Sequence, residues 1–111
     1  MIEIEIETLQ KANVVRLVGE IDAGSAAAVQ QKVLPLSGQG SQILLDLSKV
    51  AYMSSAGLRM LLSVYRQITS NHGQMVLVGL SEELKDTMSM TGFLSYFTIQ
   101  DTVETGLQAL S

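Results

Sequence analysis

The sequence contains no cysteine, which excludes disulfide bonds, thiolate zinc sites and cysteine nucleophiles together. Histidine is nearly absent as well. The only one, His72, stands in an Asn-His-Gly turn, where an imidazole usually serves as a polar residue at the end of a helix. The sequence shows no partners for a histidine-based triad or metal site. We therefore expect no metal, no cofactor and no catalytic residues in this chain.

Basic residues are few, since seven Lys and Arg stand against eleven Asp and Glu, for a net charge of -4. Such a chain lacks the positive surface that binds phosphate backbones or anionic lipids, so nucleic acid is not an expected partner. The first residues, MIEIEIET, lack the basic and apolar regions of a signal peptide. No uncharged stretch is long enough to span a bilayer. We expect a cytoplasmic protein without direct membrane insertion.

Aliphatic side chains are plentiful, because 47% of the residues are hydrophobic while only 5% are aromatic. A chain of 111 residues with this composition can bury one core and has no room for two, so residues 1–111 are predicted to form a single domain. The aliphatic content is far above that of disordered chains.

The N-terminal third is predicted to begin with two neighbouring strands. Ile and Glu alternate over residues 2–7, as in a strand with one buried face. A second apolar segment ends at Gly19 and consists of Val14, Val15, Leu17 and Val18. The segment GEID at residues 19–22 is predicted to be a loop. Ser25 is predicted to cap a helix that Pro35 ends.

The rest of the chain is predicted to alternate strands and helices. The expected elements are a buried strand at 43–47, a helix from Ser54 or Ser55 to about Asn71, a strand at 75–78, a helix capped by Ser81 and ended by Gly92, a strand at 97–99, and a last helix begun by a capping box of Asp101 and Glu104. Strands joined through helices run parallel. The fold class is therefore α/β, with a mixed, mostly parallel sheet, an added antiparallel N-terminal strand and about four helices.

The helix near residues 55–71 has two distinct faces. Apolar side chains recur at helical spacing from Leu58 to Ile68, and polar side chains recur on the opposite side from Arg59 to Ser70. The polar face is expected to meet solvent or a partner. Gly57, in the first turn, is expected to permit a close approach, because glycine costs a helix roughly 1 kcal/mol relative to alanine.

Other candidate sites are weaker. The Gly-Gln-Gly at residues 38–40 precedes a strand rather than a helix, so it is not a phosphate-binding loop. Asp46 is expected near the end of its strand, where an aspartate could accept a phosphate. Such a site also needs an acidic pair for magnesium at the end of the first strand and a lysine on the last strand, and the sequence has neither. Asp46 is more simply a structural carboxylate. Met60, Met75 and Met88 fit core positions.

Ser54 and Ser55 lie between a predicted strand and the start of a long helix, where free backbone amides can receive a phosphate. A serine at this position is most simply a helix cap. The two roles are compatible, because a capping hydroxyl is accessible and can also accept a phosphate. The added charge of roughly -1.5 to -2 would change recognition without refolding the domain.

The segment DLSKVAYMSSAGLRMLL, residues 46–62, resembles the signature of the STAS domain of bacterial anti-sigma factor antagonists, also called anti-anti-sigma factors. GEID at residues 19–22 matches the first-loop motif of that family, and the order of strands and helices agrees over essentially the whole chain. In family members the phosphorylated serine follows an aspartate and stands two residues before a glycine. This register places the phosphorylation site at Ser55, with Ser54 in the aspartate position as the second candidate.

The resemblance implies a phosphorylation-controlled binding module of the STAS fold rather than an enzyme. Unphosphorylated members bind a GHKL-type serine kinase that doubles as an anti-sigma factor or switch protein, the kinase inactivates them by phosphorylation, and a PP2C-type phosphatase restores them. The surface that faces the kinase maps onto Asp22, Ser54, Ser55, Gly57 and Arg59. As exposed side chains, Asp22 and Arg59 are expected to serve binding and to add little stability.

Two alternatives come from other classes of protein. One is a STAS scaffold subunit of a membrane lipid or anion transport system, which would have no phosphate cycle. The other is a small hydrolase or phosphotransferase that uses Asp22, Asp46 and Ser55, which would turn over generic esters or phosphate donors.

Overall fold

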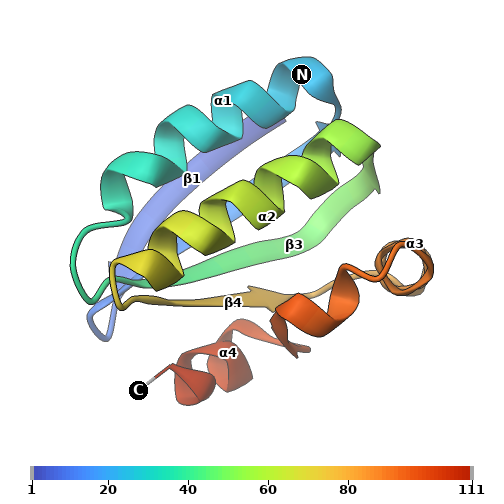
Figure 1. Ribbon diagram of the computed structural model, residues 1–111. Helices are drawn as coiled ribbons and strands as arrows, with labels where there is room; N and C mark the ends of the chain where they lie inside the picture. Colours follow the sequence, from blue (N-terminus) through green and yellow to red (C-terminus); the bar gives the residue numbers. More distant parts are fainter. Residues whose placement is uncertain (1, 111) are drawn as a thin grey trace.

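The computed structural model describes residues 2–110, which form one five-stranded sheet flanked by helices (Figure 1). The strands lie in the order β1-β2-β3-β4-β5; β1 is antiparallel to β2, and all other neighbours are parallel. The elements are β1 (Ile2–Leu9), β2 (Ala12–Ile21), α1 (Ala23–Val33), β3 (Gln42–Met53), α2 (Ser55–Ser70), β4 (Gln74–Val78), α3 (Glu82–Met90), β5 (Thr98–Gln100) and α4 (Val103–Ala109), with short 3-10 turns at Leu34–Leu36 and Leu94–Tyr96. The predicted fold class is confirmed.

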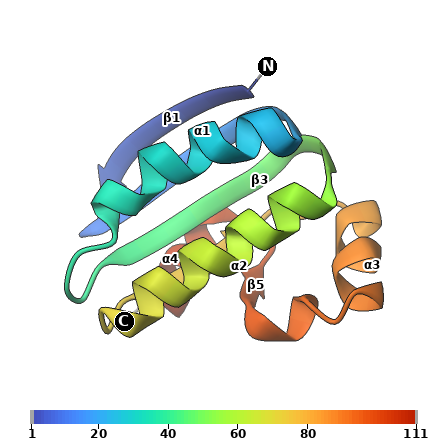
Figure 2. The same ribbon diagram turned by 45° about the horizontal axis from the view of Figure 1, so that its top comes forward.

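Three layers make up the molecule, because α1 and α2 pack on one face of the sheet and α4 packs on the other (Figures 1 and 2). The alternation of strand side chains explains this arrangement. Ile43 and Leu45 of β3 belong to the large core under α1 and α2, whereas Leu44 belongs to the smaller core under α4. All three are fully buried, so β3 is covered on both faces as its apolar run predicts.

Asp46 does not lie near the end of its strand, because β3 continues for seven residues beyond it to Met53. The carboxylate accepts hydrogen bonds from the backbone N–H and the hydroxyl of Ser48, at 3.0 and 2.7 Å. The interpretation of Asp46 as a structural carboxylate agrees with these contacts, although the expected position in the strand was wrong.

The segment GEID is not a loop, since β2 runs through Gly19 and Glu20 to Ile21. Gly19 has a φ of 126°, and the pairing with β3 shifts register between Gly19 and Glu20. Glycine therefore marks an irregularity inside the strand rather than its end. The prediction of Ser25 as the cap of α1 was also wrong: Asp22 is the N-cap, and Ser25 is the third helical residue.

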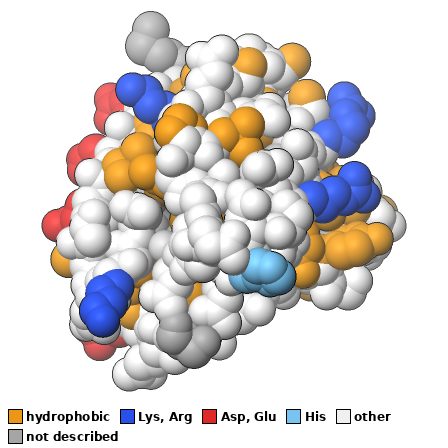
Figure 3. All heavy atoms as spheres, turned by 60° about the vertical axis from the view of Figure 1, so that its left-hand side comes forward, with side chains coloured by type: hydrophobic (Ala, Val, Ile, Leu, Met, Phe, Trp, Pro, Cys, Tyr) orange, Lys and Arg blue, Asp and Glu red, His pale blue; other side chains and the backbone are white. Residues whose placement is uncertain are grey.

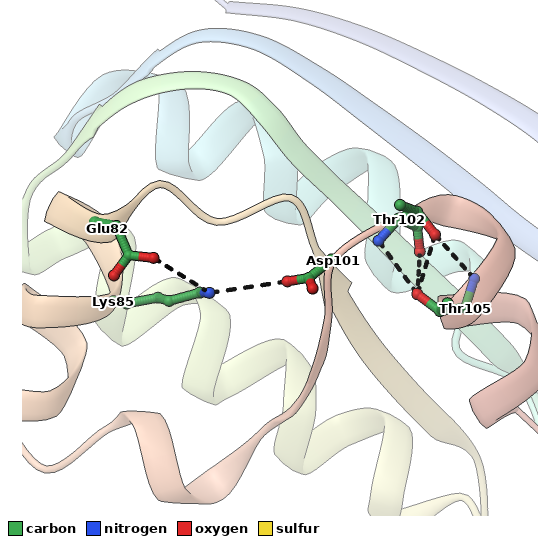
Figure 4. Close-up of polar contacts among 5 residues, drawn as sticks. All are labelled: Glu82, Lys85, Asp101, Thr102 and Thr105. Carbon is green, nitrogen blue, oxygen red and sulfur yellow. Dashed lines mark hydrogen bonds and ion pairs between the residues drawn. The ribbon is translucent and has the colours of Figure 1, made fainter.

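The start of α4 also differs from the prediction. Thr102 is the N-cap, and it forms a capping box with Thr105 in which each side chain bonds the other residue's backbone N–H (Figure 4). Asp101 instead points toward Lys85 of α3, with Nζ and Oδ1 3.9 Å apart (Figure 4). Two overlapping capping patterns are present in this segment, and the threonine pair is the one that forms.

The edge strand β1 has a less buried inner face than its alternation predicts. Ile2 and Ile4 are half-buried against the core, but Ile6 is 40% exposed. Glu3, Glu5 and Glu7 project from the other face. Glu7 pairs with Arg16 of β2, and this contact raises the pKa of the guanidinium.

Gly106 lies where α4 packs closely against the sheet. A Cβ at this position would lie 2.6 Å from Cγ1 of Val78 and 2.7 Å from Cδ1 of Leu44, both of them packed core atoms. We expect Gly106→Ala to lower the free energy of unfolding by about 1–3 kcal/mol through overpacking, measured by denaturant titration. Gly24→Ala is the control in α1, because its Cβ would meet nothing closer than 3.7 Å. It is expected to be neutral or stabilising by up to about 1 kcal/mol, and equal losses in both variants would contradict the assignment.

Candidate functional site

The predicted site lies where β2 and β3 end side by side and two helices begin. Ile21 pairs with Met53 at the carboxyl ends of these parallel strands. The backbone N–H of Ser54 donates to the carbonyl of Ile21 at 2.8 Å, which ties the start of α2 to the end of β2. Asp22 and Ser54, the N-caps of α1 and α2, are therefore neighbours, and the first turns of these helices lie at one edge of the sheet (Figure 2).

Ser54 is hydrogen-bonded to the first turn of α2. Its side-chain oxygen accepts a hydrogen bond from the backbone N–H of Gly57 at 3.3 Å, and its carbonyl accepts from the N–H of Leu58 at 3.0 Å. The residue is half-buried. The prediction that a serine caps this helix is confirmed, and Ser54 is the serine that does so.

Ser55 takes no part in capping α2. It is the first residue of α2 and is exposed, and its hydroxyl has no hydrogen-bond partner within residues 2–110. In the same part of the chain, the backbone N–H groups of Ser55 and Ala56 also lack partners. Free amides at a helix N-terminus favour a negative charge. The Ser55 hydroxyl is therefore accessible and stands beside groups that stabilise a phosphate.

Gly57 is buried because α2 begins directly against the end of β2. A Cβ would lie 2.6 Å from Cγ of Met53, 2.9 Å from Cγ2 of Ile21 and 3.1 Å from the carbonyl oxygen of Ile21. The first two atoms belong to side chains, but the third is backbone and cannot move freely. The close approach that the sequence predicts at Gly57 is present in the structure.

Asp22 is exposed, yet it organises the start of α1. Its carboxylate accepts from the N–H of Ser25 at 3.0 Å, and the Ser25 hydroxyl accepts from the N–H of Asp22 at 2.8 Å. The Ser25 N–H and hydroxyl contacts lower the pKa of Asp22 below its ordinary value of 3.8. The expectation that Asp22 adds little stability was therefore wrong, because alanine here removes a helix cap as well as a charge.

Arg59 lies one turn beyond Ser55 on the outer face of α2. It is exposed together with Ser63 and Arg66, as the predicted polar face requires. Within residues 2–110, Arg59 makes no ion pair. The structure thus joins Ser54 and Gly57 by a hydrogen bond and places Asp22 next to them through Ile21, with Ser55 adjacent and Arg59 further along α2.

A groove between α2 and α3 adds residues that the sequence did not point to. Its walls include Tyr52, Ser54, Ser55 and Leu58 on one side and Glu83 and Thr87 of α3 on the other. Tyr52 is 51% exposed. The approach of α3 depends on contacts between distant segments, so no local pattern in the sequence predicts this groove. The sequence feature nearest to an indication is Tyr52, two residues before the serine pair.

Two negative findings accompany this geometry. Among residues 2–110, no three His, Asp or Glu side chains lie close enough together to hold a metal ion. No helix in the described chain is long and apolar enough to cross a membrane.

We expect Gly57→Val to lower the free energy of unfolding by about 1–3 kcal/mol, because the added atoms collide with Met53 and with the Ile21 backbone. Chemical denaturation measures the change. Gly38→Ala is the control, since a Cβ there meets nothing within 4 Å. Gly73→Ala is unsuitable for this purpose, because its Cβ would lie 2.6 Å from the Ser41 carbonyl. Unchanged stability in Gly57→Val would show that the helix start can move away from β2.

The lowered pKa of Asp22 makes its contribution depend on pH. A depressed carboxyl pKa stabilises the folded state above the unfolded value, near pH 4, and this stabilisation is lost as pH falls through the folded pKa. Asp22→Asn keeps an oxygen that accepts hydrogen bonds but cannot ionise. We expect the thermal midpoint of wild type to exceed that of Asp22→Asn at pH 7 and the difference to shrink from pH 4 downward. A difference independent of pH would contradict the assignment.

Comparison with known proteins identifies relatives of this chain. The family model described as the STAS domain matches residues 3–106. The anti-sigma-B factor antagonist of Bacillus subtilis is 30% identical over 107 residues, which cover 96% of this chain and 98% of that protein. Among solved structures, an anti-sigma factor antagonist from Mycobacterium paratuberculosis is 25% identical, with a TM-score of 0.87 over 99% of this chain and 94% of that one. The phosphorylated form of the Bacillus cell fate determinant SpoIIAA, 20% identical, shares the fold, with a TM-score of 0.73 over 96% of this chain and 97% of its own. The chain therefore belongs to the STAS domain family.

Proposed function

We propose that this protein is an anti-sigma factor antagonist that is switched off by phosphorylation of Ser55. The names of its relatives support the antagonist role. The single observation that carries the switch is the state of Ser55, an exposed hydroxyl without a hydrogen-bond partner in residues 2–110, at a helix start with two free amides. The protein acts as a ligand and a substrate rather than as an enzyme, in the cytoplasm.

The contacts of the two serines favour Ser55 over Ser54 as the acceptor. The Ser54 oxygen already accepts from Gly57, and its modification would disturb the cap of α2. The Ser55 oxygen can attack the γ-phosphorus of ATP in a kinase active site. The bond from that phosphorus to the bridging oxygen breaks, ADP leaves, and the serine proton passes to a base of the kinase.

The partner in this proposal is a GHKL-type serine kinase that acts as an anti-sigma factor or switch protein. Its footprint is the edge formed by Asp22, Ser54, Ser55, Gly57 and Arg59. Glu83 borders the same groove as Ser55, so a phosphate there would add negative charge beside an existing carboxylate. Release requires only that the partner bind the modified form less well, and a loss of about 1.4 kcal/mol weakens binding tenfold. A PP2C-type phosphatase then restores the hydroxyl.

The phosphate is expected to alter recognition and leave the fold unchanged. Ser55 lies on the surface of a helix that is held by buried residues on its other face, including Leu58 and Leu61. The modification adds roughly -1.5 to -2 charges at a helix start, where the dipole stabilises them.

Phosphopeptide mapping after incubation with ATP and the co-encoded kinase tests the proposal. We expect Ser55→Ala to abolish labelling while it still binds the kinase, and Ser55→Glu to bind poorly. Ser54→Ala should still be labelled, although it loses a cap worth about 1 kcal/mol. Ser54→Asp restores the capping oxygen and separates that loss of stability from any effect on labelling. Ser63→Ala, an exposed serine further along α2, is the matched control.

Labelling that persists in Ser55→Ala and disappears in both Ser54 variants would place the acceptor at Ser54. No labelling by any co-encoded kinase, together with co-purification of transporter subunits, would favour the scaffold role of a STAS domain in a lipid or anion transport system. Turnover of esters or phosphate donors by the isolated protein would overturn the non-enzymatic assignment.

A further inference from the structure

The protein has a net negative charge, but the charged side chains within α1 and α2 are all cationic; Asp22, the N-cap of α1, is the carboxylate at the start of these helices. No Asp or Glu occurs in α1 or α2, whereas Lys32, Arg59 and Arg66 do. Acidic side chains gather on other elements, among them β1 and α3. Figure 3 shows acidic groups along one edge of the molecule with some Lys and Arg groups beside them, and further Lys and Arg groups at the opposite edge. The outer face of α2 therefore has a local sign opposite to that of the whole chain.

Ser55 and Arg59 occupy one side of this cationic helix. They are four residues apart within a continuous α-helix and are both exposed. Side chains at this spacing are neighbours, with about 5–6 Å between their Cβ atoms. A phosphorylated serine reaches further than a hydroxyl, and an arginine side chain is long and flexible. A phosphate on Ser55 therefore lies within reach of the Arg59 guanidinium.

Arg59 stands in an electrostatically poor position while Ser55 is unmodified. It lies in the second turn of α2, near the positive end of the helix, and the first turn contains no acidic residue. In the described chain no carboxylate pairs with it. Arg66, seven residues further on, lies about 10.5 Å along the helix axis from Arg59 and out of reach of Ser55.

We propose that Arg59 is the intramolecular counter-ion of phosphorylated Ser55, so that modification adds negative charge and at the same time withdraws this guanidinium from the docking surface. The inference rests on the proposed function, because it takes Ser55 as the acceptor. Guanidinium and phosphate form paired, charge-assisted hydrogen bonds. The groove that Ser55 borders also includes Glu83, and Asp22 caps the neighbouring helix; both charges repel a phosphate, so Arg59 is the favourable partner.

The pairing also defines the chemistry of the partner surface. In the unmodified protein, Arg59 is free to meet a carboxylate of the partner. In the phosphorylated protein the guanidinium is occupied within its own helix, and the partner's carboxylate faces a phosphate instead. The partner surface over α2 is therefore acidic. The change at one serine thus removes an attraction and adds a repulsion.

The test uses protein with phosphoserine installed at position 55 during biosynthesis, so no kinase is needed. Phosphorus-31 NMR follows the second ionisation of the phosphate, which ordinarily has a pKa near 6. A nearby guanidinium favours the dianion, so we expect this pKa in wild type to lie roughly 0.2–0.7 units below that in Arg59→Gln. Arg66→Gln is the matched control, with the same charge change, and should titrate like wild type. The difference should shrink in 1 M NaCl, where the screening length is about 3 Å.

Identical titration of wild type and Arg59→Gln would overturn the pairing, and so would an equal shift in Arg66→Gln, because that shift would be a general charge effect. Far-ultraviolet circular dichroism checks that each variant is folded. The outcome is independent of kinase labelling: failure of a kinase to label Ser55 contradicts the proposed function, whereas the phosphorus titration alone decides the role of Arg59.

Discussion

The parallel pairing of β2 with β3 is the constraint on which the site depends. Both strands end at the same level, where Ile21 lies opposite Met53, and the next residue of each chain segment caps a helix. The hydrogen bond from the Ser54 N–H to the Ile21 carbonyl joins the two ends. Ile21 and Met53 are themselves buried, although Tyr52 beside them is exposed, so the pair is anchored on the core side of the sheet. The two helix starts are thereby held beside each other with little freedom.

Gly57 fixes the position of α2 relative to the ends of β2 and β3. It lets the first turn of α2 rest on Ile21 and Met53, which fixes the direction of the helix. With the buried side anchored, Ala56 and Gly57 separate the two serines from the core stripe that begins at Leu58, and Ser55 is turned outward. The cap at Ser54 and the free hydroxyl at Ser55 are consequences of one local geometry. The two adjacent serines thus have different roles, since Ser54 caps the helix and Ser55 leaves its hydroxyl exposed.

Much of this fold follows from local signals in the sequence, and the errors have identifiable physical causes. The long helix and its cap were predictable, because a serine precedes a clear helical repeat from Leu58 to Ile68. Gly19 was misleading, because a glycine with positive φ can mark an irregularity inside a strand as well as the end of one. At the last helix, the Asp101 and Thr102 capping patterns are offset by one residue, and sequence spacing alone does not choose between them. The groove under α3 joins segments about thirty residues apart, so no local pattern could reveal it.

The position of Ser55 on an anchored helix has a consequence for the proposed phosphorylation. A kinase can bind a flexible loop in an extended conformation and recognise it by its local sequence. The start of α2 cannot unwind in this way without exposing the buried residues Gly57 and Leu58. A kinase that modifies Ser55 as proposed would therefore meet a rigid surface formed by two strand ends and two helix starts. Its selectivity would depend on the shape of this surface, to which side chains more than thirty residues apart in the sequence contribute, such as Asp22 and Ser55. A change in the core that tilts α2 would accordingly alter recognition while every surface residue stayed the same.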